Sequence, residues 1–98
     1  MTVYTLGRWV VKPGREEDFV ATWHALGQWT VENGFESHGT LLRDHADRSR
    51  FVSFGPWRSV EDVERWRSHP EFQRHLADIR DTLESFEPGT FDVVLSVS

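Results

Sequence analysis

The chain has 98 residues, 38% of them hydrophobic and 28% charged, and a net charge of −5. This length fits a single domain, residues 1–98, and the acidic balance argues against nucleic acid or an anionic membrane as a partner. Cysteine is absent, which excludes disulfides and thiolate chemistry. The sequence shows neither an apolar run of about eighteen residues nor a signal-peptide pattern, so we expect a soluble cytoplasmic protein.

The first half of the chain predicts a strand, a helix and a second strand. Residues 4–12 are rich in β-branched and aromatic side chains and end at Pro13-Gly14, which indicates a strand followed by a turn. Residues 15–33 begin with acidic side chains and repeat apolar ones at helical spacing, so we expect a helix there. Residues 37–44 predict a second strand.

The second half predicts a third strand, a helix in two pieces and a last strand. The third strand is expected at residues 50–57. Ser59, followed by Asp62, resembles a helix cap, and Pro70 suits the first turn of the next helix. The apolar stripe of that helix is expected to run through Phe72, Leu76, Ile79, Leu83 and Phe86.

A turn at Pro88-Gly89 places the last strand at residues 90–98. The resulting order is βαββαβ. It predicts a ferredoxin-like α+β fold, in which a four-stranded antiparallel sheet carries its helices on one face.

Both faces of this sheet are expected to be apolar. One alternating set of side chains is Trp9, Val11, Phe51 and Trp57, and the other is Leu6, Val10, Val52 and Phe54. Because the helices can cover only one face, we expect a second copy of the chain to cover the other, giving a homodimer. The space enclosed between sheet and helices is then the expected ligand site.

Three stretches carry a resemblance to a known family: residues 10–19 (VVKPGREEDF), 57–62 (WRSVED) and 66–72 (WRSHPEF). With them, the chain resembles the antibiotic biosynthesis monooxygenase family of dimeric α+β barrels over nearly its whole length. The resemblance implies that fold and one of two chemistries.

The first implied chemistry is the oxidation of polycyclic phenols by O2 without a cofactor, in which the deprotonated substrate is itself the reductant. The resemblance matches Trp57 to a strand Trp of these enzymes, and places Ser53 where they carry an Asn and Val63 near a Tyr of theirs. The residues themselves leave a choice. The Trp57 indole can stack on a flat ligand or cap the core, and the Ser53 hydroxyl can bind a ligand oxygen or the backbone.

The second implied chemistry is haem binding and degradation. The resemblance matches Trp66 to a helical Trp and places His75 about one position from the histidine that binds the iron, while Gly7 stands where those enzymes carry an Asn. Read from the residues alone, Trp66 also serves as a core anchor, and His75 lies at the edge of the apolar stripe.

Two further side chains can act on a ligand. His38 can deprotonate a phenol if it points into the cavity, and it is a surface residue if it points outward. Arg43 can pair with a substrate carboxylate or enolate, or with a carboxylate on a neighbouring strand. The catalytic candidates are Trp57, Ser53, His38 and His75. The substrate-binding candidates are Trp9, Phe51, Arg43 and Trp66.

The sequence therefore predicts a cofactor-independent monooxygenase that uses O2 as co-substrate and acts on an aromatic or polyphenolic, polyketide-like small molecule. One alternative is a haem-binding or haem-degrading protein of the same fold. Another is a dimer without redox chemistry, which cyclises or only binds a polyketide.

Overall fold

The computed structural model describes residues 2–35 and 38–98. Within these ranges the elements follow one another as β1 (Val3–Val11), α1 (Glu16–Glu32), β2 (Thr40–Arg43), β3 (Arg50–Trp57), α2 (Val60–Ser68), α3 (Pro70–Arg80) and β4 (Leu83–Asp92). The predicted βαββαβ order, with the second helix in two pieces, is confirmed. No helix among the described residues is long and apolar enough to cross a membrane.

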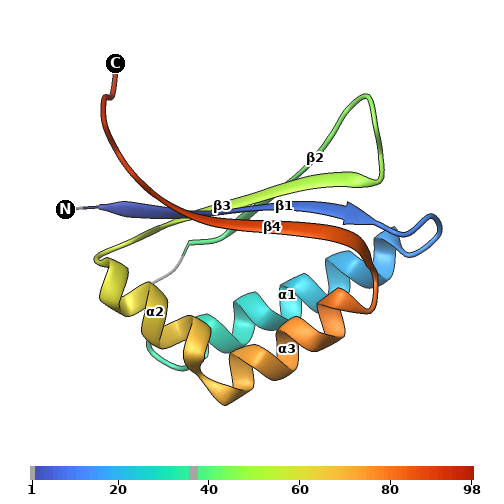
Figure 1. The fold of residues 1–98 in the computed structure, drawn as a ribbon, viewed down its shortest axis with the longest axis horizontal. Coiled ribbons are helices and arrows are strands. Elements are labelled where there is room, and N and C mark those ends of the chain that lie inside the picture. The colour runs from blue at the N-terminus through green and yellow to red at the C-terminus, as the bar shows by residue number, and fades with distance from the viewer. Residues whose placement is uncertain (1, 36–37) are drawn as a thin grey trace.

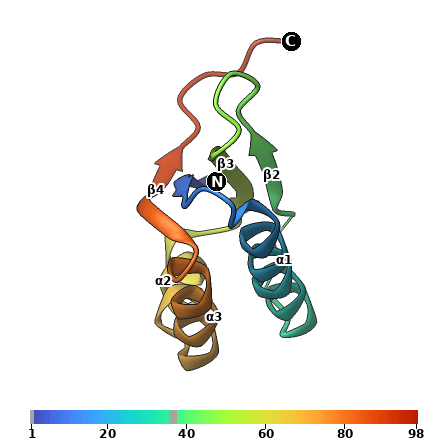
Figure 2. The same ribbon diagram turned by 90° about the vertical axis from the view of Figure 1, so that its right-hand side faces the viewer.

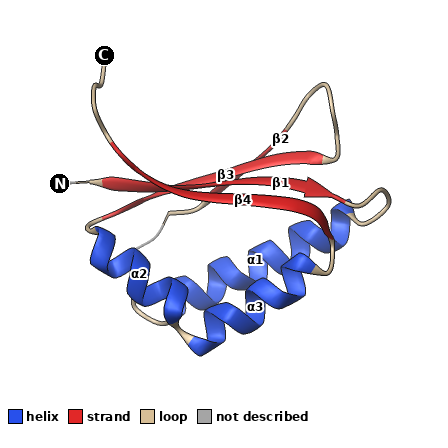
Figure 3. Ribbon diagram, in the orientation of Figure 1, coloured by secondary structure: helices blue, strands red, loops and turns tan. Residues whose placement is uncertain are grey.

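The strands form one antiparallel sheet in the order β2-β3-β1-β4, which confirms the ferredoxin-like fold. All three helices lie against the same face of this sheet, and no helix of the described residues lies on the other face (Figure 1, Figure 3). The molecule is accordingly thin, measuring 39 × 35 × 19 Å. Seen along the strands, α1 lies under one side of the sheet and α2 and α3 under the other (Figure 2).

The alternating set that begins at Trp9 faces the helices and forms the core. Trp9, Val11, Phe51 and Trp57 are all buried. Trp9 pairs with Phe51 across β1 and β3, so their rings lie side by side on the sheet. Phe19 of α1 packs onto both rings, with centroids 5.4 Å and 4.8 Å away. Strand alternation predicted two apolar faces, and the structure shows which of the two the helices cover.

The opposite face of the sheet remains largely uncovered. On this face Leu42 is 50% and Val52 36% exposed, while Leu6, Val10 and Phe54 are partly buried. These are the positions that led us to expect a second copy of the chain, and the single chain leaves that expectation a prediction.

Local signals in the sequence fix the starts of α2 and α3. The Ser59 hydroxyl accepts a hydrogen bond from the backbone N–H of Asp62 at 3.2 Å, which confirms the predicted cap. At the next junction, His69 Nδ1 accepts the backbone N–H of Glu71 at 3.1 Å, and Pro70 fills the first helical position.

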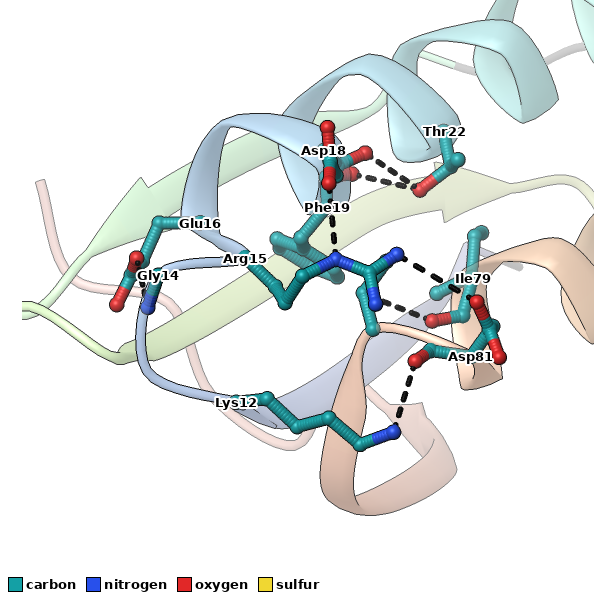
Figure 4. A network of polar contacts seen from close by, with 10 residues as sticks. Lys12, Gly14, Arg15, Glu16, Asp18, Phe19, Thr22, Ile79 and Asp81 are labelled. Carbon is teal, nitrogen blue, oxygen red and sulfur yellow. Dashed lines mark hydrogen bonds and ion pairs between the residues drawn. The ribbon is translucent and has the colours of Figure 1, made fainter.

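A polar network joins the start of α1 to the end of α3 (Figure 4). Arg15 donates to Asp18 at 2.8 Å, and another of its nitrogens lies 3.5 Å from a carboxylate oxygen of Asp81. The Lys12 ammonium donates to the backbone carbonyl of Asp81 at 3.0 Å. These groups are largely exposed, so the network links the start of α1 to the end of α3 but adds little to the stability of the fold.

The prediction for the end of α3 is wrong. The helix stops at Arg80, and Leu83 and Phe86 belong to β4. A register shift in the pairing of β1 with β4, between Val10 and Val11, places Leu83 opposite Val11 and Phe86 opposite Trp9. This bulge brings two residues three positions apart onto one face of the strand, which imitates helical spacing.

The prediction of a last strand at residues 90–98 is also wrong, since β4 ends at Asp92 and contains Pro88 and Gly89. A proline inside a strand normally disrupts a sheet, but β4 is an edge strand, where the missing N–H need not find a partner. Beyond β4 the chain leaves the sheet (Figure 1), and Val94 and Leu95 are 94% and 80% exposed.

The second strand is shorter than predicted. It runs from Thr40 to Arg43, and the expected start at residue 37 lies outside the described residues. The polar turn between β2 and β3 is held by Asp44, whose carboxylate accepts the backbone N–H groups of Ala46 and Asp47 at 2.7 and 3.1 Å.

Candidate functional site

A cavity of about 630 Å³ lies between the sheet and the two groups of helices. Its wall is mostly apolar and comes from β1, β3, β4, α1, α2 and α3. The apolar and aromatic side chains that line it include Trp9, Trp23, Leu26, Trp66, Phe72, Leu76 and Phe86. This volume is typical of sites for small organic ligands.

The sheet side of the cavity contains a buried hydroxyl that an indole orients. Trp9 Nε1 donates a hydrogen bond to Ser53 Oγ at 2.9 Å, and Ser53 is only 8% exposed. Because the indole N–H can only donate, the serine oxygen must accept. Among the described residues no acceptor takes the serine proton, so that proton is available to an acceptor inside the cavity.

The same arrangement recurs two residues further along the same sheet face. Trp57 Nε1 donates to Thr5 Oγ1 at 3.1 Å, and Thr5 also lines the cavity. Here too, the described residues provide no acceptor for the hydroxyl proton. Two hydroxyls on neighbouring strands therefore each accept an indole N–H and keep their own proton for an acceptor in the cavity.

The third indole–hydroxyl pair is structural. Trp66 Nε1 donates to Thr30 Oγ1 at 2.9 Å, and Thr30 in turn donates to the carbonyl of Leu26 at 2.7 Å. This hydroxyl has no proton left for a ligand, and the pair ties α2 to α1 at the end of the cavity wall.

Glycine at position 7 makes room for the Trp9–Ser53 pair. A methyl group there would lie 2.9 Å from both Ser53 Oγ and Trp9 Nε1. On the next strand, a methyl group at Gly55 would lie 2.9 Å from the backbone oxygen of His38. Both separations are closer than a carbon can approach without displacing its neighbours, so glycine keeps the sheet side of the cavity open.

Four ionisable side chains line the cavity, namely His24, Glu32, Arg67 and Arg80. His24 and Glu32 lie on α1 with Gln28 between them at four-residue spacing, and all three are exposed, which places them at the opening. Arg67 of α2 is partly buried, and it donates to Thr90 Oγ1 at 2.8 Å and to the carbonyl of Gly89 at 3.2 Å. Its burial lowers the pKa of the Arg67 guanidinium from its usual value.

The structure brings some of the predicted site residues together and separates others. Ser53, Trp9 and Trp66 line the cavity. Trp57 does not line it; its ring packs in a smaller core cluster, 4.8 Å from the ring of Trp66. It contacts the site through the hydrogen bond to Thr5.

Neither predicted histidine lines the cavity. His38 is exposed just before β2, and only its backbone comes close to β3, at Gly55. His75 lies on α3 with its ring centroid 5.9 Å from that of Trp29 on α1. The residues present therefore do not fit a haem in this cavity with His75 as the ligand to iron.

Phe51 and Arg43 lie at a second, smaller hollow of about 400 Å³ near the β2–β3 end of the sheet. The Arg43 guanidinium lies over the Phe51 ring, 5.2 Å from its centroid, and it donates to the carbonyl of Arg48 at 2.7 Å. Trp9 borders both hollows, so it is the predicted binding residue that the two share.

The lining residues that were not predicted from the sequence include Thr5, Arg67 and His24. Thr5 lies on the same strand face as Trp9, a periodicity that could have identified it. Arg67 follows Val63 by four positions, so it shares the inward face of α2. His24 has no such signal, because an exposed histidine on α1 looks the same in sequence whether or not a cavity lies beside it.

Among the described residues no group of three or more potential metal ligands is present.

The chain is similar to a known protein family and to several solved structures. The family model described as antibiotic biosynthesis monooxygenase matches residues 2–78. Among solved structures, SnoaB from Streptomyces nogalater, described as a cofactor-independent oxygenase, is similar over 98% of this chain and 96% of its own, with a TM-score of 0.86 and 20% identity.

Rv0793 from Mycobacterium tuberculosis is similar over 100% of both chains, with a TM-score of 0.83 and 16% identity. A conserved protein from Methanosarcina mazei Go1 is similar over 93% of this chain and 91% of its own, with a TM-score of 0.82 and 12% identity. No curated protein matches the chain. At these identities the similarity to the solved structures shows the fold alone.

Proposed function

Because the chain belongs to the antibiotic biosynthesis monooxygenase family, we propose that it is a cofactor-independent oxygenase that oxidises a hydroxylated aromatic small molecule with O2. One observation carries the proposal: an apolar cavity of about 630 Å³ is lined by the buried Ser53 hydroxyl, which accepts the Trp9 indole N–H and keeps its own proton for a ligand. The description of SnoaB, which shares the fold, as a cofactor-independent oxygenase supports the same chemistry.

In the proposed reaction the substrate supplies the electrons. Its phenolic hydroxyl loses a proton, and the phenolate passes one electron to O2, which gives a substrate radical and superoxide. These combine at a ring carbon that carries a hydrogen, and the hydroperoxide so formed loses water to leave a carbonyl. One substrate and one O2 thus yield one quinone and one water, and an apolar cavity protects the radical pair from solvent.

Ser53 has the geometry of a donor to the substrate oxygen. Its proton is free to bind an oxygen that carries negative charge, and the Trp9 hydrogen bond fixes the hydroxyl before the ligand arrives. Thr5, held by Trp57, offers a second donor on the neighbouring strand. In this proposal Trp57 is a positioning residue that acts through Thr5.

His24 is the base that the geometry favours. It is the histidine that lines the cavity, at the opening on α1, whereas His38 and His75 do not line it. A neutral imidazole nitrogen can accept a phenol proton. The proton that it takes can then return to the peroxide anion, which has to be protonated to become the hydroperoxide.

We also propose that the working unit is a homodimer. The uncovered sheet face and the exposed apolar residues after β4 support it, since Leu42, Val52, Phe91 and Val94 are 50%, 36%, 52% and 94% exposed. A large apolar surface of this kind commonly marks an interface between subunits.

The experiment is O2 uptake by the purified protein with 1,8-dihydroxyanthrone, recorded together with quinone absorbance. We expect uptake without added metal or flavin. Ser53→Ala should lower kcat/KM by about 10²-fold through loss of a preorganised donor, and His24→Gln by a similar factor. The matched control is His45→Gln, an exposed histidine of the β2–β3 turn, which should leave the rate unchanged.

Three results would contradict the proposal. Equal rates for all four proteins would remove Ser53 and His24 from the chemistry. A change in the anthrone spectrum without O2 uptake would indicate a binding protein or cyclase. A Soret band on titration with hemin, lost in His75→Ala, would indicate the haem protein that the sequence left open.

A further inference from the structure

The cavity carries positive charge in a chain whose net charge is negative. Of its ionisable lining residues, Arg67 and Arg80 are cationic and Glu32 is the one carboxylate among the described residues. The whole chain, by contrast, has 16 acidic and 11 basic residues. An apolar cavity with this balance favours an anionic ligand over a neutral or cationic one.

Arg67 is unusual among the arginines of the protein. It is partly buried, and both of its hydrogen-bond acceptors, Thr90 Oγ1 and the Gly89 carbonyl, are neutral. No carboxylate of the described residues lies within ion-pair distance of it. The guanidinium stays protonated under all ordinary conditions, so a charge is held at the cavity wall without a counter-ion.

Arg65 on the same helix shows the contrast. It is exposed, and it pairs with the Asp62 carboxylate at 3.0 Å. A charge that is shielded from water is costly unless it is paired. In α2, however, the exposed arginine has a carboxylate partner, and the partly buried one has none among the described residues. An anionic ligand in the cavity would supply the missing partner of Arg67.

The remaining donors of Arg67 suit a carboxylate. The two known hydrogen bonds use two of the five N–H groups of the guanidinium. Thr5 pairs directly with Thr90 across β1 and β4, so its free hydroxyl proton lies on the strand position next to the residue that Arg67 contacts. An Arg fork with a hydroxyl beside it is a common way of binding the two oxygens of a carboxylate.

We propose that the cavity binds aromatic acids and that Arg67 pairs with the carboxylate of the ligand. This inference rests on the proposed function and narrows its substrate class to an aromatic ring that carries both a hydroxyl and a carboxylate. Arg67 lies on α2 and His24 on α1, and these helices lie under opposite sides of the sheet (Figure 2). Both residues line the cavity. The carboxylate then anchors the ligand at one wall, and the reacting hydroxyl lies toward Ser53 and His24.

The test compares two probes of equal shape, anthracene-9-carboxylate and the neutral 9-anthracenemethanol, by quenching of Trp fluorescence at equilibrium without O2. We expect the wild type to bind the carboxylate at least about tenfold more tightly than the alcohol. Arg67→Gln should weaken carboxylate binding by about tenfold or more and alcohol binding by less than about threefold. Arg67→Lys should recover part of the preference.

Arg65→Gln is the matched control, because it removes a guanidinium from the same helix outside the cavity and should leave both affinities unchanged. Equal losses for the two probes in Arg67→Gln would overturn the inference, since Arg67 would then only tie α2 to β4. A wild type that binds both probes equally, or neither, would overturn it as well.

The binding test is independent of the oxygenase reaction. If the carboxylate preference is found and depends on Arg67, but O2 uptake is absent, then the proposed chemistry fails and the ligand class stands. If O2 uptake is found with the neutral anthrone and no carboxylate preference exists, the chemistry stands and the ligand class fails.

Discussion

Single hydroxyls and single glycines set the character of the cavity at the scale of the residue. The Ser53 and Thr5 oxygens each accept an indole N–H and retain a proton for the ligand. Their orientation depends on two Trp side chains, one of which, Trp57, does not line the cavity. Substitution of a tryptophan outside the cavity therefore affects the ligand through a hydroxyl inside it.

Gly7 gives the sharpest prediction for stability at this scale. A methyl group at position 7 would overlap Ser53 Oγ and Trp9 Nε1, both at 2.9 Å, so Gly7→Ala should destabilise the fold by about 1–3 kcal/mol. Gly27→Ala is the control, because a methyl group there meets nothing within 4 Å and lies inside α1. It should stabilise the protein by about 0.5–1 kcal/mol.

Urea denaturation followed by Trp fluorescence measures both changes. The opposite signs are the essential result. If Gly7→Ala is as stable as the wild type, then the strand or the Ser53 side chain yields easily, and the Trp9–Ser53 pair does not depend on a glycine at that position.

Part of the site could be predicted from the sequence, and the reason is periodicity. Alternation groups Ser53 and Trp9 with Phe51 and Trp57 on one strand face, and both Ser53 and Trp9 line the cavity. Which of the two apolar faces the helices cover does not follow from alternation. His38 and His75 were assigned by residue type, and no pattern fixed the direction of either side chain. To predict that Arg67 and His24 line the cavity, one must know which helices flank it. That depends on how α1 and α2 pack on the sheet.

At the scale of the element, α2 depends on its cap. Ser59 accepts the backbone N–H of Asp62, so Ser59→Ala should destabilise the protein by about 1 kcal/mol. Ser68→Ala at the other end of the same helix is the control. Its exposed hydroxyl bonds only the carbonyl of Arg65, and its loss should change the free energy of unfolding by less than about 0.5 kcal/mol. Equal effects in thermal or urea unfolding would remove the cap as the cause.

The turn between β2 and β3 predicts a dependence on pH. The backbone N–H groups of Asp47 and Ala46 hold the pKa of the Asp44 carboxyl below its usual value. Since the folded pKa is depressed, the charged form stabilises the fold above the unfolded pKa of about 3.9. That contribution is lost as the pH falls through the folded pKa.

We therefore expect Asp44→Asn to lower Tm at pH 6 and to approach the wild-type Tm near pH 2.5, in a series of thermal melts. Asp92→Asn at the end of β4 makes the same change of charge, and its side chain accepts no hydrogen bond from the described residues. It should not show this convergence. A constant difference between Asp44→Asn and wild type at every pH would contradict the role of the charge.

The element boundaries show where sequence patterns mislead. The cap at Ser59 and the limits of β3 were predicted correctly, because each depends on neighbours in the chain. The start of β4 was not, because a bulge opposite Val10 and Val11 puts Leu83 and Phe86 on one face at helical spacing. Whether Pro88 ends a strand or lies inside one depends on the position of that strand in the sheet, and β4 proves to be at its edge.

At the scale of the whole molecule, one layer of helices on one sheet leaves an apolar face without cover. This uncovered apolar face was predicted from the sequence, because both alternating sets of strand residues are apolar and the helices can cover only one of them. A thin molecule, 19 Å across its shortest dimension, has little interior of its own. The two hollows differ in where they lie. The larger lies between the sheet and the helices, and the smaller is bordered by Val52 and Leu42 of the uncovered face.

The homodimer is the prediction that belongs to this scale. Light scattering after size-exclusion chromatography should give twice the chain mass of 11.5 kDa. Val52→Lys, which places a charge on the uncovered sheet face, should give a monomer because burial of an unpaired ammonium opposes association. Val20→Lys is the matched control: Val20 is 43% exposed against 36% for Val52, but it lies on α1, and this variant should stay dimeric. A wild-type monomer would show that the apolar face serves another partner, and a Val52→Lys dimer would place the interface elsewhere, with the exposed residues after β4 as the next surface to test.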